Sequence, residues 1–276
     1  MNMRKRESSF SKQLINKLKT DPIPDWSATL AYYFMLSIFP LIIFLLAIIP
    51  YFDLDNTVIE GFIGDYLPEE IGSLFSETII ETVNQPSGGL LSFGILATIW
   101  SASNGLNALM RAINRSYDIE ETRNFVKMRL FSIILTIGMI STIVVTLIMP
   151  VFGTVIINFL ETYLAMPEAT ASLLNVLRYP VGVVFMILLL TLIYWISPNV
   201  KLKFKEVIIG AVIATLGWQL VSFFFSLYIS NFANYSATYG SLGGVIILML
   251  WFFITGIMLV LGGQINAVIY QRKRFI

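Results

Sequence analysis

The residues that could do chemistry in this 276-residue chain are arginines, amides and hydroxyls, because histidine and cysteine are both absent. Without those two residue types there is no disulfide, no zinc site built from Cys or His, and no Cys or His nucleophile. We therefore expect no metal, no cofactor and no enzymatic activity. What remains is recognition chemistry, in which guanidinium and amide groups bind an anionic or polar ligand.

A polar stripe runs through the apolar segment that begins near residue 88. Its members recur every three or four residues and so share one helical face: Trp100, Asn104, Asn107, Arg111 and Asn114 or Arg115. Lipid would penalise such a face. It therefore lines a wet substrate path or makes ordinary hydrogen bonds with neighbouring helices. The sequence leaves both open, and on the first alternative Asn104, Asn107 and Arg111 line the path.

Arg178 is the one basic residue that falls on the acidic side of the chain. It lies near the start of an apolar segment, two residues before Pro180. Its guanidinium suits a carboxylate or a phosphate. Alternatively it reaches outward to Glu161, Glu168 or water.

Two further candidates precede a proline within the first apolar segment. Tyr32 and Tyr33 come before Pro40, and bent or broken helices at membrane depth often form the binding sites of transporters. The alternative, which we prefer, is that the proline makes a simple packing bend.

Other candidates lie in the middle of a span or in a polar loop. Trp218 and Gln219 are central in their segment, where packing is the alternative to lining a cavity, whereas Trp26 and Trp195 are placed as interface tryptophans. Tyr235 and Tyr239 belong to the hydroxyl-rich and glycine-rich stretch 231–244. They complete the set of substrate-path candidates.

Apolar segments must position these residues. Hydrophobic residues make up 57% of the chain and charged residues 13%, against about 25% charged in ordinary soluble domains. A helix that spans the bilayer needs about 20 apolar residues. Six segments qualify, at about 27–51, 88–110, 130–156, 175–197, 207–229 and 242–269. The sequence therefore predicts an all-α membrane protein with a six-helix transmembrane bundle.

The net charge of +1 conceals a strong separation of charge. All but one of the 18 Lys and Arg residues lie in the N-terminal segment, the second and fourth connections and the C-terminus. The loops on the other side carry acids or no charge. The positive-inside rule then places both termini in the cytoplasm.

Three parts follow from this separation. Residues 1–24 form a cytoplasmic basic amphipathic segment, 25–270 a single six-helix transmembrane domain, and 271–276 a cytoplasmic basic tail. Residues 55–84 are too polar to span and predict short amphipathic helices on the outer face. These act either as a lid over an opening or as a plain connector.

The N-terminal segment also predicts a partner. Phe10, Leu14 and Leu18 share one face of a Lys-rich helix, which is typical of an anchor on anionic membrane lipids. A nucleic-acid arm would need similar charges, but no RNA-reading module accompanies them. We expect membrane lipids as partners and no nucleic acid.

Four blocks resemble the signature blocks of the YihY/BrkB family: LAYYFMLSIFP (30–40), WSASNGLNALMRAINRSY (100–117), LRYP (177–180) and SLYISNFANYSATYGSLGGVIILMLW (226–251). The resemblance implies a six-helix, multi-pass protein of the bacterial cytoplasmic membrane. Members are linked to serum resistance and to suspected export of lipid or lipopolysaccharide precursors. The family has also carried a ribonuclease label, ribonuclease BN. This sequence does not support that label, because it lacks histidine and its acids at 118–121 are typical of a solvated turn.

The leading hypothesis is a transporter or exporter of an amphiphilic or anionic, lipid-related substrate. No ATP-binding P-loop is present, so an ion gradient or a partner would drive transport, or transport would be passive. The alternative is a non-transporting envelope scaffold or assembly factor. The sequence leaves a homo-oligomer open.

Overall fold

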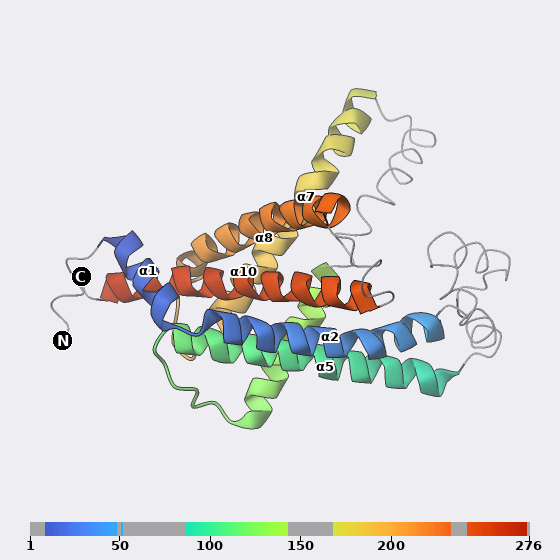
Figure 1. Ribbon diagram of the computed structural model, residues 1–276, viewed down its shortest axis with the longest axis horizontal. Helices are drawn as coiled ribbons and strands as arrows, with labels where there is room; N and C mark the ends of the chain where they lie inside the picture. The colour runs from blue at the N-terminus through green and yellow to red at the C-terminus, as the bar shows by residue number, and fades with distance from the viewer. Residues whose placement is uncertain (1–8, 49–50, 52–86, 143–167, 233–241, 275–276) are drawn as a thin grey trace. The chain divides into compact units, whose positions relative to one another are not determined.

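The computed structural model describes residues 9–48, 51, 87–142, 168–232 and 242–274. Within these ranges the regular elements are all helices, labelled in Figure 1 except for the helix Phe125–Thr142. The labelled helices are α1 (Phe10–Thr20), α2 (Ile23–Ile48), α5 (Gly88–Ser116), α7 (Glu168–Ile196), α8 (Phe204–Phe232) and α10 (Leu242–Arg274).

Five helical stretches in the described residues are long and apolar enough to cross a membrane: Ile23–Phe44, Gly88–Ser116, Phe125–Thr142, Phe204–Ile229 and Leu242–Arg274. The stretch Pro180–Ile196 within α7 is a shorter apolar helix. An all-helical membrane protein agrees with these lengths. The count of six spans stays a prediction, and so does the placement of the termini. The predicted outer helices at 55–84 lie outside the described residues.

The helix at the second predicted span is longer than its hydropathy suggests. The predicted span ends near residue 110, whereas α5 continues to Ser116. The polar residues of its second half therefore lie on a continuous helix. At the other end of the chain, α10 runs to Arg274 and includes part of the predicted tail.

The chain divides into two compact units. Unit 1 comprises Met1–Tyr32 and Ser103–Ile276, and unit 2 comprises Tyr33–Ala102. Within unit 2, α2 and α5 approach closely at Gly94. A Cβ at this position would lie 2.8 Å from the Cα and N atoms of Phe44, so only glycine permits this approach.

In unit 1, α10 packs against α1 and α8, and α7 packs against α8. The contact between α8 and α10 is close because Gly210 faces Gly262. The Asn266 side chain accepts a 2.8 Å hydrogen bond from the Gly210 N–H and donates one of 2.9 Å to the Val207 carbonyl. The helices are thus joined by backbone proximity and by one amide that both donates and accepts, a pattern common between membrane helices.

The C-terminus of α5 has a defined stop. Asp118 takes a left-handed conformation with φ 57°, and the Ile119 N–H donates to the Asn114 carbonyl at 3.0 Å. The Asp118 N–H donates to the Arg115 carbonyl, also at 3.0 Å. This pair of bonds is a Schellman motif. It fixes the last helical turns, which carry Arg111 and Arg115.

Candidate functional site

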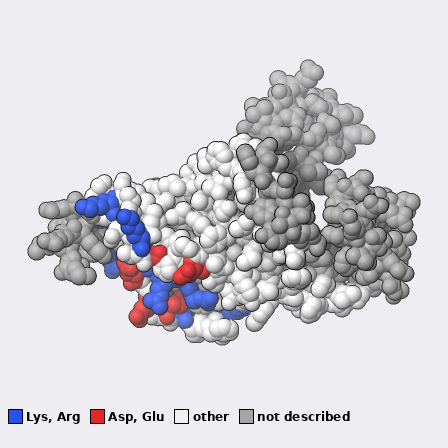
Figure 2. Space-filling view, viewed as in Figure 1, with Lys and Arg blue, Asp and Glu red and all other residues white. Residues whose placement is uncertain are grey.

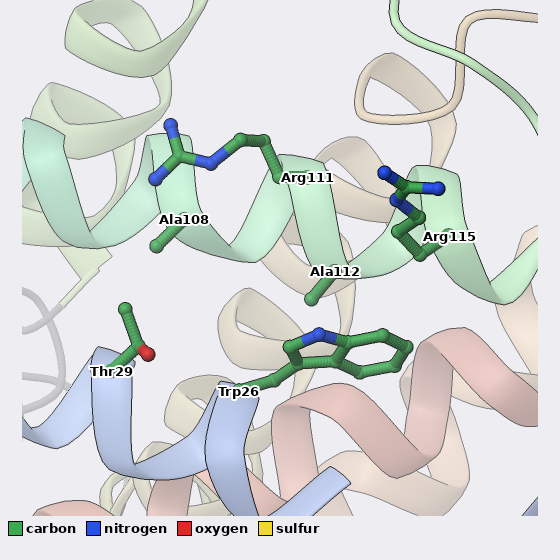
Figure 3. Close-up of a pocket in the computed structure, with 6 residues that line it drawn as sticks. All are labelled: Trp26, Thr29, Ala108, Arg111, Ala112 and Arg115. Atoms are coloured by element: carbon green, nitrogen blue, oxygen red, sulfur yellow. The ribbon is translucent and has the colours of Figure 1, made fainter. Parts of the chain in front are cut away.

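A cavity of about 220 Å³ lies in unit 1 between the start of α2 and the end of α5. We call it the arginine cavity. Figure 3 shows Trp26 and Thr29 on the α2 side and four residues on the α5 side. Its lining residues are Trp26, Thr29, Ala108, Arg111, Ala112 and Arg115.

The order of small and large side chains along α5 explains the shape of this cavity. Ala108 and Ala112 are buried and point toward α2 (Figure 3), and their small side chains leave the space open. Arg111 and Arg115 each follow one of these alanines by three residues, and both are exposed. They lie one turn apart on the same side of α5, and Figure 3 shows their guanidinium groups apart from each other, with that of Arg111 extended back toward Ala108.

The charges in the arginine cavity are not neutralised from within. Neither Arg111 nor Arg115 forms an ion pair within the described ranges, where the bridged cations are Lys17, Arg123 and Lys273. Two like charges one turn apart on a helix weakly destabilise it. An anion bound between the guanidinium groups would remove that cost.

The other polar groups of the cavity differ in what they can offer. The Thr29 hydroxyl already donates to the Asp25 carbonyl at 2.9 Å. The Trp26 indole N–H has no hydrogen-bond partner among the residues that the structure describes. The free donors are therefore the two guanidinium groups and this indole, a set suited to an anion with several acceptor oxygens.

A second cluster holds both walls of the cavity. Lys17 donates to the Ser116 carbonyl at 2.5 Å, and its Nζ lies 3.5 Å from carboxylate oxygens of Asp21 and Asp118. Asp21 also accepts a 2.6 Å hydrogen bond from Gln264 of α10. This Lys17 clasp joins the residues just before α2 to the residue just after Arg115. Lysine also suits the negative end of α5.

The turn after α5 is a network of bonds rather than a solvated turn. Arg123 binds Glu121 through two nitrogens, at 2.6 and 2.7 Å, and donates to the carbonyls of Ile196 and Ser197. Asn114 donates to Glu121 at 2.7 Å. Partial burial of Glu121 by itself would raise its pKa. The hydrogen bonds and positive charge of Arg123, together with the hydrogen bond from Asn114, have the larger effect, so the pKa of Glu121 is lowered.

A buried cation lies beside the polar stripe. Arg129, on the helix Phe125–Thr142, is 8% exposed and donates to the Asn104 side-chain oxygen at 2.6 Å. Ser132 and Thr136, on the same helix, are fully buried and donate to their own backbone. The predicted stripe therefore meets a second polar face inside unit 1.

The structure assigns different surroundings to the predicted site residues. Arg111 lines the arginine cavity, and Asn104 binds Arg129. Asn107 is half-buried, and its side-chain oxygen is buried without a hydrogen-bond partner among the described residues.

Trp218 and Gln219 lie on α8. Trp218 donates to Thr255 at 3.0 Å and meets Trp251 edge-on, with ring centroids 6.0 Å apart. Gln219 is half-buried. Trp218 thus contributes to packing between α8 and α10 and does not line the arginine cavity.

The remaining predicted residues are spread over the chain. Tyr32 is 55% exposed, and Tyr33 is half-buried in unit 2. Arg178 belongs to α7, but its side chain lies outside the described part. Tyr235 and Tyr239 also lie outside the described residues.

Sequence reasoning missed three residues near the site. The sequence predicts Trp26 as an interface tryptophan and Arg115 as an alternative member of the polar stripe. It does not distinguish Lys17 from the other cations of the N-terminal segment. A signal for Arg115 existed, because it continues the spacing of Arg111 beyond the apolar segment. Trp26 and Lys17 required the pairing of helices that are far apart in sequence.

Charge gathers at the same end of unit 1. Figure 2 shows the visible Lys, Arg, Asp and Glu side chains close together near α1 and the end of α5. The other visible surface of the described residues is uncharged. The arginine cavity, at the end of α5, therefore lies where a charged region meets an uncharged surface.

Comparison with known proteins gives the family. A profile described as "Virulence factor BrkB" matches residues 14–275. The chain belongs to the BrkB family. It is 45% identical over 266 residues to a protein of Bacillus subtilis named as ribonuclease-like, YfkH, covering 96% of this chain and 97% of that one.

More distant relatives are named as membrane proteins. The chain is 26% identical to the UPF0761 membrane protein PBPRA3489 of Photobacterium profundum, over 98% of its own length and 84% of that protein. It is 28% identical to PSHAa0171 of Pseudoalteromonas translucida, over 93% and 84%. No solved structure matches this chain. The protein is a polytopic membrane protein of this family.

Proposed function

We propose that this protein is a transporter that moves an anionic amphiphile across the bacterial cytoplasmic membrane. The observation that carries the proposal is the arginine cavity, where Arg111 and Arg115 present charge without an ion pair in the described residues. In this proposal the positive-inside rule places the basic end, and hence the cavity, at the cytoplasmic face. The amphiphile enters there.

The surroundings of the cavity support an amphiphilic substrate. Trp26 has an apolar ring with a polar N–H, a combination suited to the membrane–water interface. Tyr32 continues the exposed edge of α2 beyond Thr29. The charged head of an amphiphile would meet the arginines of the cavity, and its apolar chains would meet the rings of Trp26 and Tyr32.

Polar residues deeper in unit 1 support a route across the membrane. A charged side chain inside a membrane protein is costly and usually marks a pathway or a binding site. Arg129 meets this description, and the neutral Asn104 accepts its hydrogen bond. We propose that they follow Arg111 along the path, with Asn107 as a further polar contact.

The proposal contains no covalent step. The ribonuclease-like name belongs to the Bacillus relative. In this chain Glu121 is bound by Arg123 and Asn114, and Asp118 accepts from Gln271 at 2.8 Å and lies 3.5 Å from Lys17. We propose that these carboxylates hold the helix ends together. No ATP-binding loop was found in the sequence, so we expect passive or gradient-driven movement.

Reconstitution into liposomes tests the proposal. Vesicles with purified protein and a trace of headgroup-labelled phosphatidylglycerol are treated with a membrane-impermeant quencher. We expect faster loss of inner-leaflet fluorescence than in protein-free vesicles. The measurement is made both without a gradient and with an imposed proton or sodium gradient. If vesicles with and without the protein lose fluorescence at the same rate in every case, this transport function is wrong. The scaffold alternative would then account for the protein, and crosslinking would be expected to capture a stoichiometric partner.

A further inference from the structure

We propose that the arginine cavity recognises the phosphate group of an anionic phospholipid. This inference rests on the proposed function, because the cavity is then the entry site of the transported amphiphile. It goes further by naming the chemical group bound and its source, a lipid of the adjacent leaflet.

The donors in the cavity suit the shape of a phosphate group better than the planar shape of a carboxylate. Each guanidinium carries five N–H donors in a planar fork, and the indole of Trp26 adds one more. One fork is enough to satisfy the two oxygens of a carboxylate. The phosphate group of a phospholipid also has two anionic oxygens, but these and its two ester oxygens are arranged tetrahedrally, so two forks can approach it at different angles. Residues four apart on a helix have Cβ atoms about 5–6 Å apart. In Figure 3 the two guanidinium groups lie apart, with that of Arg111 extended back toward Ala108, so binding one phosphate between them requires these exposed side chains to turn toward each other.

The size of the cavity points to a headgroup attached to something larger. Its volume is about 220 Å³, below the roughly 300–1,000 Å³ of pockets that enclose whole small ligands. We propose that the lipid headgroup enters it while the acyl chains stay in the bilayer. Tyr32, one turn beyond Thr29, is exposed on that side. The exposed ring of Tyr32 can contact the acyl chains of a lipid whose headgroup is bound in the cavity.

Lys12 and Lys19 provide a matched control at the same end of the molecule. Both are exposed on α1, where the predicted anchor gives them only a general attraction to the anionic membrane surface, and neither forms an ion pair in the described part of the chain. Replacing them removes the same charge as replacing the two arginines but leaves the cavity intact. The comparison therefore separates a built site from general attraction to anionic lipid.

Native mass spectrometry of the full chain in detergent tests the inference. Phosphatidylglycerol, phosphatidylcholine, oleate and inorganic phosphate are added separately. We expect wild type and K12Q/K19Q to retain phosphatidylglycerol in preference to the other three probes. We expect R111Q/R115Q to bind it at least about tenfold more weakly, because the charged hydrogen bonds of both forks are lost. R111K/R115K, which keeps charge but loses the forks, should fall between them.

Three results would overturn the inference. Equal phosphatidylglycerol binding by R111Q/R115Q and K12Q/K19Q would show that the cavity is not the site. Oleate retained as well as phosphatidylglycerol would show that phosphate is not the recognised group. Inorganic phosphate bound equally well would make it a free-anion site. Phosphatidylglycerol binding without transport would support this inference and contradict the proposed function, whereas transport without such binding would do the reverse.

Discussion

Arg111 and Arg115 differ from Arg123 in what surrounds their charge. Arg123 is nearly buried, with a carboxylate and two carbonyls as acceptors, so its charge serves the fold. The two arginines of the cavity are exposed, and neither forms an ion pair in the described residues. A guanidinium that stabilises no internal contact is available for a ligand, which is why we assign recognition to this pair.

The Glu121 ion pair predicts a dependence of stability on pH. The pKa of Glu121 is lowered in the folded protein, so the pair stabilises it fully above the unfolded value of 4.5 and loses this effect as the pH falls through the folded pKa. We expect Glu121→Gln to lower the melting temperature at neutral pH and to reduce its fall on acidification. Thermal unfolding in detergent at several pH values measures both.

Glu120→Gln is the matched control, because Glu120 is exposed in the same turn. It should keep the wild-type profile. If Glu121→Gln keeps that profile as well, the Arg123 pair does not stabilise the turn.

At the scale of the helix, composition predicts the spans better than it predicts the site. Apolar runs indicate five helices that the structure contains. The cavity lies in the part of α5 beyond the apolar run, where a Schellman motif, not hydropathy, decides the end. Trp26 lies beside the end of α5 because α2 packs against α5, and the residues concerned are about 80 positions apart in the sequence. The three- to four-residue spacing of polar residues within one helix carries no information about such a contact.

The close contact of α8 and α10 predicts a sharp sensitivity at Gly210. A Cβ there would clash with the Gly262 carbonyl and would lie 2.5 Å from the Asn266 side chain. We expect Gly210→Ala to destabilise the protein by about 1–3 kcal/mol, the usual cost of overpacking. Chemical unfolding in mixed micelles measures this loss.

Gly244→Ala controls for the helix propensity of alanine. A Cβ at Gly244 meets nothing within 4 Å. This variant should be as stable as wild type or slightly more so. Equal stability of both variants would mean that α8 and α10 do not approach as described.

The Lys17 clasp predicts the dynamics of α1. Lys17→Met removes the bonds to the Ser116 carbonyl and to two carboxylates, so we expect faster amide exchange in α1 and in the last turn of α5. Lys19→Met, at an exposed position, should leave exchange unchanged. Hydrogen exchange with mass spectrometry compares them, and unchanged exchange in Lys17→Met would show that the clasp does not hold α1.

At the scale of the whole molecule, the orientation in the membrane remains a prediction from charge. The chain contains no cysteine, so a single introduced cysteine reports its own side. We expect an impermeant maleimide to label Glu77→Cys in intact cells, and Lys12→Cys or Arg272→Cys only after permeabilisation. Labelling of Lys12→Cys in intact cells would reverse the topology and place the arginine cavity at the outer face.

The central claim is that the arginine cavity serves transport, and the initial rate of lipid movement in proteoliposomes tests it most directly. We predict that R111Q/R115Q slows transport of labelled phosphatidylglycerol by about tenfold or more, as expected for losing at least 1.4 kcal/mol of binding, while K12Q/K19Q transports at the wild-type rate. Equal rates for the two double variants, at equal amounts of folded protein, would contradict the account.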